Sequence, residues 1–536
     1  MNKRLLIALV LSFFVLIGFN YILPQSQKSA PAASKTEHGV DTRTDSPKSP
    51  ENGAKAASSM QEPRSDIQKS SVATGPEEII ATVETKRYTL KIDKLGRFVS
   101  IVLTDEKYRG EDGKKLELIE PDRTPPLELR FADNSINAEA FRTPYSASSA
   151  SLDASGGAVE LTLTQKLSTL TVSKRLKFYP DGHYDLRIDT DKEKKYFVTT
   201  GHRPEADKSR YMIVRGVLLR DANGIITTLE DGDVQESGKF EKINIVSSFD
   251  RYYASLFYNF EKPFEVIVMS DKENDPLPFI SASGSMELHG YAGAKEWKLF
   301  EKLDPRLTDA VEFGWFTFLA KPFFKIMLSI YDFVGNWGWA IVLFTILVKL
   351  VLFPLSYKGM MSMQKLKDLA PKMKEIKEKY GKDPAKMNQQ MMELYKKHGA
   401  NPMGGCLPML LQIPVFFALY RVLLNADELQ GAPWILWISD LSRQDPYFVL
   451  PILMGVTMFV QQLITPNTMT DPMQQKIFKW FPVIMTFFFL TFPSGLVLYW
   501  LTNNILSIAQ QYYINHAYEK YKEKVRKRSA NREAQE

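Results

Sequence analysis

Hydrophobic residues gather at the two ends of the chain, whereas the middle alternates apolar with polar positions. An uncharged apolar run from Leu5 to Leu23 follows a basic N-terminus and is long enough to cross a membrane as a helix. We interpret residues 1–23 as an uncleaved membrane anchor; the alternative, cleavage at Ala30-Pro31-Ala32, lies well beyond the run. Residues 24–77 are mostly Ser, Ala, Pro, Lys, Glu and Gln, so we expect a disordered linker there.

Residues 78–305 change to a hydrophobic period of two, which is typical of strands with one buried face. The clearest alternating runs are Tyr88–Ile92, Val159–Thr164 and His183–Asp189. Phe264–Met269 is more continuously apolar, which indicates a strand buried on both faces. Turn signals at 180–182 and 221–224 separate the runs, so the region is predicted to form a large antiparallel β-sandwich. It contains no cysteine, and its core must hold it together without a disulfide.

Long apolar segments return after residue 305. Residues 306–336 include Phe313–Val334, whose mixture of aromatic and charged residues predicts an amphipathic helix lying along the membrane surface. Residues 337–515 are predicted to form a five-helix core. Its apolar segments are Trp337–Leu355, Leu407–Leu424, Tyr447–Ile464 and Ile477–Tyr513. Pro493-Ser494-Gly495 breaks the last segment into two spans, so the whole chain is predicted to have six transmembrane helices.

The distribution of charge between the spans predicts their orientation. Residues 356–403 contain eleven Lys against five acidic residues, whereas residues 426–446 contain one Arg against four acidic residues. Because basic loops stay in the cytoplasm, the first loop is predicted to be cytoplasmic and the second to lie outside. Both termini then face the cytoplasm, residues 516–536 form a basic cytoplasmic tail, and the β-domain lies in the periplasm of a bacterium.

The first loop has helical character. Residues 357–399 are predicted to form a cytoplasmic hairpin of two helices, Met360–Tyr380 and Pro384–Lys397, with a break at Gly381. The hairpin is rich in methionine, a residue that offers adaptable apolar surface to varied partners. The same methionines can instead pack the two helices against each other, and the sequence leaves both interpretations open.

Lys349 is the only charged residue in the segment Trp337–Leu355. A charge at the centre of a membrane helix costs roughly 2.5–3.5 kcal/mol, so its presence indicates a function. Gly338, Thr345 and Ser356 share its helical face and are small or polar, which predicts a stripe that faces a wetter space than lipid. The alternative is that the long side chain simply reaches back to the nearer membrane surface.

Other predicted spans also carry polar side chains at depths where lipid disfavours them. They are Gln412, Gln461, Gln462, Tyr499, Asn503, Ser507 and Gln510. Together with Lys349 and Thr345 they predict one polar cavity with a positive floor, although each alone is explained by hydrogen bonds between helices. His183, His202 and His289 are scattered, and no nucleotide, zinc or catalytic-triad spacing is present, so we expect no enzyme activity, catalytic residue, metal or cofactor.

Six motifs carry a resemblance to a known family. They are PMGGCLP at 402–408, LWISDLS at 436–442, DPY at 445–447, PILMG at 451–455, DPMQQK at 471–476 and FPSGLVLYW at 492–500. The chain resembles the YidC membrane protein insertases of Gram-negative bacteria along its whole length. The resemblance implies a polytopic α-helical membrane protein with a large periplasmic β-supersandwich. It also implies a groove open to the cytoplasm and lipid, with a basic residue that is usually Arg and is Lys349 here.

The resemblance further implies insertion and folding of nascent membrane proteins in the bacterial inner membrane, alone or with the Sec translocon. Expected partners are nascent membrane proteins, the ribosome, the translocon and membrane lipids, with no recognition of a nucleic-acid sequence. The groove residues expected to bind substrate are Lys349, Thr345, Gln412, Tyr499, Trp500, Asn503, Ser507 and Gln510. The expected hydrophobic slide consists of Val415, Phe416, Met485 and Phe488. The alternatives are a secondary transporter that uses the intramembrane lysine and a sugar-processing β-domain.

Overall fold

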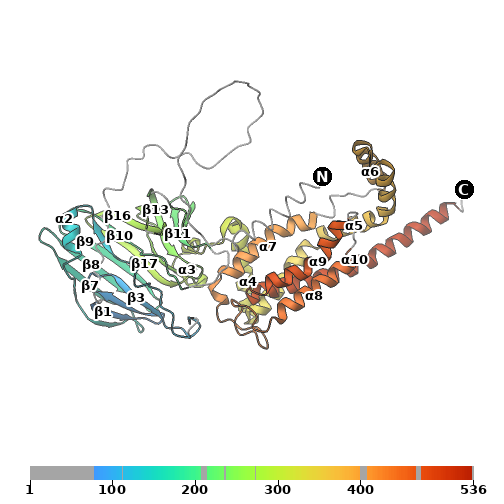
Figure 1. Cartoon of the computed structure of the whole chain (residues 1–536). Helices are drawn as coiled ribbons and strands as arrows, with labels where there is room; N and C mark the ends of the chain where they lie inside the picture. Colours follow the sequence, from blue (N-terminus) through green and yellow to red (C-terminus); the bar gives the residue numbers. More distant parts are fainter. Residues whose placement is uncertain are drawn as a thin grey trace, which may run out of the picture. The chain divides into compact units, whose positions relative to one another are not determined.

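The computed structural model describes residues 78–110, 113–206, 214–234, 237–271, 273–398, 407–465 and 472–533. All of these residues belong to one compact unit, which comprises a β-domain and a set of long helices (Figure 1). The predicted N-terminal anchor and linker, residues 1–77, lie outside the described residues.

The β-domain contains two sheets. The smaller has the order β3-β2-β1-β6, and the larger joins thirteen strands along the path β4-β10-β16-β15-β13-β14-β17-β9-β8-β7-β5, with β11 paired to β12 and β13 beside it. The strands of the small sheet are β1 Ile79–Glu84, β2 Tyr88–Asp93, β3 Phe98–Leu103 and β6 Ser151–Asp153. Those of the large sheet are β4 Leu129–Phe131, β5 Ser146–Ala147, β7 Val159–Lys166, β8 Thr171–Phe178, β9 His183–Thr190, β10 Lys195–Thr199, β11 Gly216–Asp221, β12 Ile226–Glu230, β13 Gly238–Phe249, β14 Tyr253–Tyr258, β15 Phe264–Ser270, β16 Pro276–Ser283 and β17 Met286–Ala294.

The runs predicted from the sequence coincide with β2, β7, β9 and β15, and the two turn signals lie between β8 and β9 and between β11 and β12. The pairing is antiparallel throughout the large sheet, and β1 with β6 is a parallel pair in the small one. The two sheets pack on a shared core, where the ring of Phe98 in β3 lies 5.4 Å from that of Tyr184 in β9. In β15, Val266 faces this core and Ile267 faces a second cluster, as a strand buried on both faces requires.

Short helices lie within and after the β-domain: α2 Asn134–Ala140, α3 Trp297–Leu303 and the 3-10 turns Pro305–Ala310 and Gly314–Phe316. The long helices follow: α4 Thr317–Val334, α5 Trp337–Tyr380, α6 Pro384–Lys397, α7 Leu407–Asn425, α8 Val449–Ile464, α9 Pro472–Phe489 and α10 Ser494–Glu533. A further 3-10 turn, Asp427–Leu429, follows α7. Helix α10 packs along α5 and α8, α8 packs on α9, and α4 packs on both α5 and α7 (Figure 1).

Two helices continue further than the sequence pattern indicates. The predicted span from Trp337 and the first helix of the hairpin form one uninterrupted helix, α5, and the predicted sixth span continues through the basic tail to Glu533. Pro354 and Pro371 lie inside α5 without ending it. The break at Pro493-Ser494-Gly495 is present, because α9 ends at Phe489 and α10 begins at Ser494.

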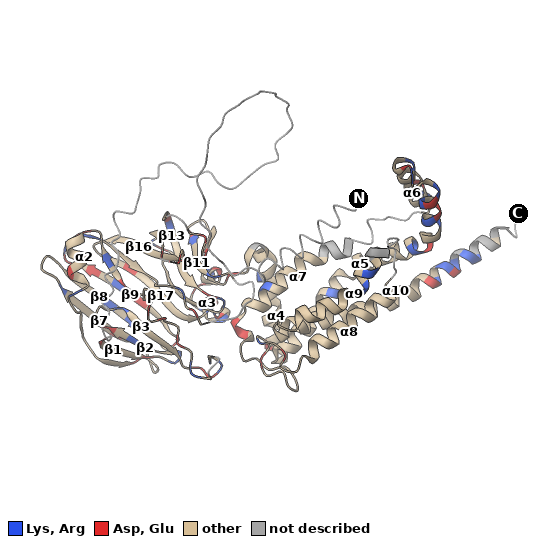
Figure 2. Ribbon diagram, in the orientation of Figure 1, with Lys and Arg blue, Asp and Glu red and all other residues tan. Residues whose placement is uncertain are grey.

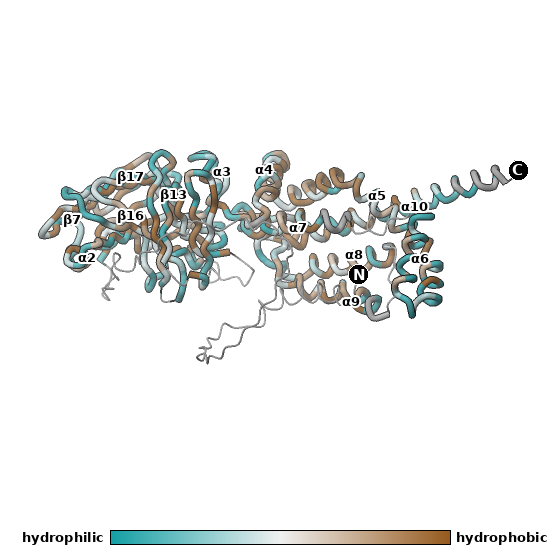
Figure 3. Tube along the Cα trace, turned by 90° about the horizontal axis from the view of Figure 1, so that it is seen from above, coloured by the Kyte–Doolittle hydropathy of each residue, from teal (hydrophilic) through white to brown (hydrophobic). Residues whose placement is uncertain are grey.

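Among the described residues, α5 is the one helix both long and apolar enough to cross a membrane by the usual criteria. Residues 412–425 of α7 and the whole of α8 are shorter apolar helices. Charged side chains are rare along α7 and α8 and gather on α6 and the C-terminal part of α10 (Figure 2). Hydropathy follows the same division, with hydrophobic residues along α7 and hydrophilic residues on α6 (Figure 3).

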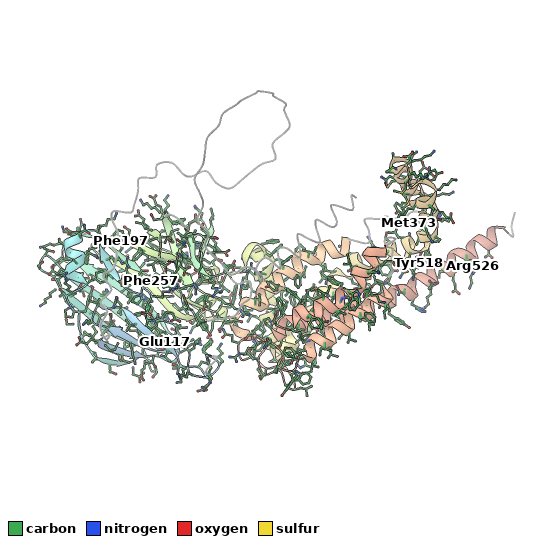
Figure 4. The ribbon with its side chains drawn as sticks, in the orientation of Figure 1. Glu117, Phe197, Phe257, Met373, Tyr518 and Arg526 are labelled. Atoms are coloured by element: carbon green, nitrogen blue, oxygen red, sulfur yellow. The ribbon has the colours of Figure 1, made fainter. Side chains whose placement is uncertain are left out.

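The hairpin of α5 and α6 has a small apolar core of its own. Leu366 and Leu369 are buried against Met373, Leu394 and Tyr395, and Figure 4 shows Met373 in this hairpin. Met373 therefore packs the two helices against each other, which is one of the two interpretations of the methionines that the sequence leaves open. Met392, in contrast, is 53% exposed and is free to contact a partner.

Candidate functional site

A polar cavity, partly open to the outside, lies among α5, α7 and α10. The residues that line it are Thr345, Val348, Lys349, Leu352, Leu355, Ser356, Gln412, Val415, Tyr499 and Asn503. Three helices that are far apart in the sequence thus contribute to one space. The stripe predicted on α5 contributes Thr345, Lys349 and Ser356, which are spaced by four and then seven residues along the helix.

Hydrogen bonds between the helices organise the cavity. The Lys349 ammonium donates to Ser507 Oγ at 2.8 Å, and the Ser507 hydroxyl donates to the carbonyl oxygen of Asn503 at 2.7 Å. Gln412 Nε2 donates to Asn503 Oδ1 at 2.9 Å, so one side chain of α10 connects to α7. Lys349 therefore has a neutral partner, and none of the described lining residues is acidic. The cavity keeps a positive charge that a negative group on a ligand can approach.

The remaining predicted groove residues differ in their placement. Thr345 is 1% exposed and donates to the Ile341 carbonyl oxygen of its own helix at 2.7 Å. Tyr499 lines the cavity and is buried. Trp500 does not line it and instead contacts the ring of Phe416 edge-on at 4.8 Å between ring centres. Gln510 is buried one turn below Ser507, and within the described part of the chain its Nε2 has no hydrogen-bond partner.

The four predicted slide residues lie on α7 and α9. Val415 lines the cavity and Met485 is buried, whereas Phe416 and Phe488 are partly exposed. More strongly exposed apolar side chains are present on the same two helices. They are Ile413 and Phe417 on α7, and Val483, Ile484 and Phe487 on α9. The outer apolar surface of these helices is therefore broader than the four predicted residues indicate.

The outer loop, which we define as residues 426–448 between α7 and α8, packs on the start of α5. Its Trp434 packs on the start of α5, where a Cβ on Gly338 would lie only 2.1 Å from Trp434 Cδ1. The Asn336 side chain donates to the Pro433 carbonyl oxygen at 3.1 Å and fixes the same contact. Gly338 thus lies on the predicted polar stripe but is covered by an indole instead of lining the cavity.

The outer loop is also bonded to the turn between α9 and α10. Ser494 Oγ donates to the Arg443 carbonyl oxygen at 2.8 Å, and the Gly495 amide donates to that of Leu441 at 2.9 Å. Asp445 is fully buried, and its carboxylate accepts hydrogen bonds from Trp437 Nε1 and from backbone amides at the start of α8. The sequence shows these residues as family motifs, but it gives no signal of which helices they join.

Polar contacts at the opposite end of the helices were not predicted. Gln364 of α5 and Gln511 both donate to Asn515 Oδ1 of α10, the second at 2.7 Å. Asp368 accepts a hydrogen bond from Tyr518 at 2.9 Å and forms an ion pair with Lys522 at 3.2 Å. The base of the hairpin is therefore attached to α10 (Figure 4 shows Tyr518 on this helix). Gln and Asp spaced by four residues on one helix was the available signal.

In the β-domain, ligand atoms of His202, Glu205 and Asp275 lie within 4.8 Å of one another, a spacing compatible with a metal ion. The Arg123 guanidinium already supplies positive charge to these carboxylates, at 3.3 Å from Glu205 and 3.0 Å from Asp271. The cluster is therefore explained as an ion-pair network that closes loops of the β-domain.

Comparison with known proteins agrees with this architecture. A family model described as "60Kd inner membrane protein" matches residues 329–523, and one described as "YidC periplasmic domain" matches residues 280–326. The membrane protein insertase YidC of Campylobacter jejuni is 47% identical over 522 residues, which cover 97% of each chain. That of Wolinella succinogenes is 48% identical over 527 residues, covering 97% of this chain and 96% of the relative.

A crystal structure titled as an active YidC insertase with its first transmembrane domain resolved aligns with 82% of this chain and 95% of its own, at 20% identity. Its TM-score of 0.35 is too low to carry an argument. The sequence relatives decide the family, because they match nearly the full length, including the β-rich domain and the apolar helix α5. The chain belongs to the YidC family of membrane protein insertases.

Proposed function

We propose that this protein inserts nascent membrane proteins into the bacterial inner membrane and that the polar cavity receives the polar flank of the entering segment. The observation that carries the proposal is the Lys349 ammonium, which lines the cavity and is bonded only to the neutral Ser507 hydroxyl among the described contacts. A positive charge within an apolar helix offers an acidic or polar flank a favourable position part-way across the bilayer.

The proposed mechanism needs no catalytic residue and no nucleotide. A polar flank that crosses hydrocarbon unaided leaves its peptide groups without hydrogen bonds, at several kcal/mol for each group. In the cavity, Lys349, Gln412 and Asn503 supply donors and acceptors instead, which lowers the barrier. The apolar part of the entering segment then moves into lipid under its own hydrophobic transfer free energy.

We place the hydrophobic slide on α7 and α9. Phe416 and Phe488 are partly exposed there, and Ile413 and Phe487 extend the same apolar surfaces, Phe487 being 69% exposed. An entering helix can exchange contacts with this surface for contacts with lipid at little cost, because both are apolar.

The proposed topology has six transmembrane helices, both termini in the cytoplasm and the β-domain in the periplasm. Support comes from the apolar helix α5, the shorter apolar helices α7 and α8, and the turn between α9 and α10. In this arrangement the outer loop covers the periplasmic end of the cavity, and the hairpin of α5 and α6 projects into the cytoplasm.

The proposed partners are nascent membrane proteins, membrane lipids, the ribosome and the Sec translocon. The basic C-terminal part of α10 and the Lys-rich hairpin offer positive charge to the ribosome without reading a nucleic-acid sequence (Figure 2). The alternative of a secondary transporter lacks support, because relatives matched over nearly the whole chain are named insertases.

Site-specific photocrosslinking tests the proposal. A photoreactive amino acid at Gln412 or Tyr499, both of which line the cavity, should trap a ribosome-bound nascent membrane protein. The matched control is Tyr512 on α10, which is 75% exposed and does not line the cavity. Crosslinks at Tyr512 equal to those at the two cavity positions would contradict entry through the cavity.

A further inference from the structure

The end of α7 nearest the β-domain is enclosed by charged and polar side chains from that domain. We call this arrangement the α7 socket and define it by Lys107, Tyr108, Arg251 and Tyr253. Arg251, which is 3% exposed, donates from Nε to the Leu424 carbonyl oxygen at 2.6 Å. The last carbonyl groups of a helix have no partner within it, and a cation at that end is favourable. Arg251 therefore caps the C-terminus of α7.

The socket continues at Asp427, two residues beyond α7. The Asp427 side chain is completely buried, and its Oδ2 accepts from Lys107 Nζ at 2.9 Å and from Tyr108 Oη at 2.8 Å. Gln430 Nε2 donates to its Oδ1 at 2.9 Å, and Tyr253 Oη donates to Gln430 Oε1, also at 2.9 Å. Burial raises the pKa of the Asp427 carboxyl even though Lys107 opposes the shift. A buried carboxylate with these partners fixes its own position closely, because each lost partner leaves a desolvated group.

A second carboxylate, that of Glu428, joins the outer loop to the start of α3. Glu428 Oε1 accepts from the Trp297 backbone amide, at the start of α3, at 3.0 Å. Glu296 precedes Trp297 in the sequence. Its carboxylate forms an ion pair with Arg87 at 2.6 Å and lies 4.0 Å from the Lys107 ammonium. Lys107 thus lies within 4.0 Å of both Asp427 and Glu296, so the contact is a connected ionic network between the outer loop and the β-domain.

The consequence reaches the cavity through α7 itself. This helix carries Gln412 and Val415, which form one wall, and it packs more closely on α4 than on the opposite walls α5 and α10. The walls α5 and α10 are packed along each other, whereas α7 has fewer neighbours on α10 and meets it at the Gln412–Asn503 hydrogen bond and at the ring contact of Phe416 with Trp500. The contacts of the socket hold the C-terminal end of α7 and thereby constrain where this wall lies.

We propose that Asp427 and Arg251 are positioning residues through which the β-domain sets the distance between α7 and α10, and with it the width of the cavity. The socket gives the periplasmic domain a role in the membrane site to which it contributes no lining residue. The effect on insertion rests on the proposed function of the cavity, but the effect on helix position does not.

Double electron–electron resonance, which measures the distance between two spin labels, tests the proposal on the full chain in liposomes. Cys406→Ser removes the only native cysteine, and labels are then attached at Ile413→Cys on α7 and Ile505→Cys on α10. Both positions are exposed, at 43% and 51%, and neither lines the cavity. Asp427→Ala should broaden the distance distribution and shift its mean, and Lys107→Met should do the same from the β-domain side.

The control is Asp332→Ala, which breaks an exposed ion pair of the same kind, Lys298–Asp332, whose side chains are both more than half exposed. Exposed pairs contribute little, so the distance distribution should stay that of the parent chain. The double variant Asp427→Ala with Lys107→Met should be no worse than the worse single variant, because neither charge of this ion pair is then left buried without the other.

Insertion of a model client is measured in parallel, and we expect a several-fold loss for Asp427→Ala. Unchanged distances in both single variants, in protein that is folded and inserted in the bilayer, would overturn the positioning role. Broadened distances with full insertion activity would uphold that role and count against the proposed function of the cavity.

Discussion

Gly338→Ala should displace the outer loop from the start of α5, and we expect this displacement to open the nearby end of the polar cavity. The added Cβ would lie 2.1 Å from Trp434 Cδ1 and 2.3 Å from Cγ. Ordinary carbon contacts are about 3.5–4.0 Å, so the indole must move by at least about 1.4 Å. Rotation of the indole alone does not relieve the clash, because the added Cβ would also lie 2.7 Å from Trp434 Cβ, and the Trp434 backbone is held by hydrogen bonds to Ile438 and Asn336. The outer loop must therefore move with it.

The size of the effect follows from the cost of overpacking, which is about 1–3 kcal/mol. If this cost falls on the closed position of the outer loop, the open population rises by about 5- to 140-fold, at 1.4 kcal/mol for each factor of ten. Thr345 is a suitable reporter because it is buried and lies seven residues, about 10 Å, further along α5.

The assay is labelling of Thr345→Cys, in a Cys406→Ser background, by a membrane-impermeant maleimide added to the periplasmic side. Gly338→Ala should raise the labelling rate within the range given above. Gly156→Ala serves as the matched control, since its Cβ would meet no atom within 4 Å. An unchanged rate in a Gly338→Ala protein with intact thermal unfolding would refute the assignment of Trp434 as the cover of the cavity.

Three further outcomes are expected from the packing of single side chains. Gly455→Ala should destabilise the α8–α9 contact by about 1–3 kcal/mol, because its Cβ would lie 1.9 Å from Thr486 Oγ1. The thermal unfolding midpoint should be restored when Gly455→Ala is combined with Thr486→Ala, but not when it is combined with Thr486→Ser, which keeps the hydroxyl. Lys174 is fully buried in the β-domain, and burial lowers its pKa to about 7. The unfolded chain then binds more protons than the folded one between about pH 7 and pH 10, so stability should rise with pH in that window, and Lys174→Met should abolish the slope in unfolding midpoints. Asp368→Ala should speed hydrogen exchange in the hairpin of α5 and α6 several-fold, because it removes the bonds to Tyr518 and Lys522; exchange at the parent rate would mean that the hairpin core alone holds it.

Local sequence patterns correctly predicted several strands and one turn. Alternation in Val159–Thr164 and His183–Asp189 located β7 and β9, and Pro493-Ser494-Gly495 located the turn before α10. Each of these signals depends on neighbours within a few residues, where hydrophobic period and turn chemistry act directly. Helix α5 continues past Leu355 although Pro354 and Pro371 each remove a backbone hydrogen bond. The helix-forming residues around the two prolines outweigh this loss, and the sequence pattern alone does not show that they do.

The cavity was predictable in part because a charge in an apolar segment is conspicuous. Lys349, Thr345, Gln412, Tyr499 and Asn503 do line one cavity, since polar groups at membrane depth must find one another or water. The contacts that position the cavity were not predictable: Lys107 and Asp427 are 320 residues apart, and both look like ordinary surface charges in the sequence. Only the folded chain shows that Asp427 is buried and that Trp434 needs a glycine opposite it.

The role of charge in the cavity is tested most directly by replacing Lys349 and measuring insertion of two clients that differ only in acidic residues of the translocated flank. At an effective dielectric constant near 20, an ion pair at about 4 Å is worth about 4 kcal/mol before desolvation. Lys349→Arg should therefore retain activity, Lys349→Leu should slow the acidic client more than the neutral one, and Lys349→Glu should be the worst variant and show the largest difference. Equal losses for the two clients with every variant would contradict the account, because Lys349 would then act through hydration or packing and not through its charge.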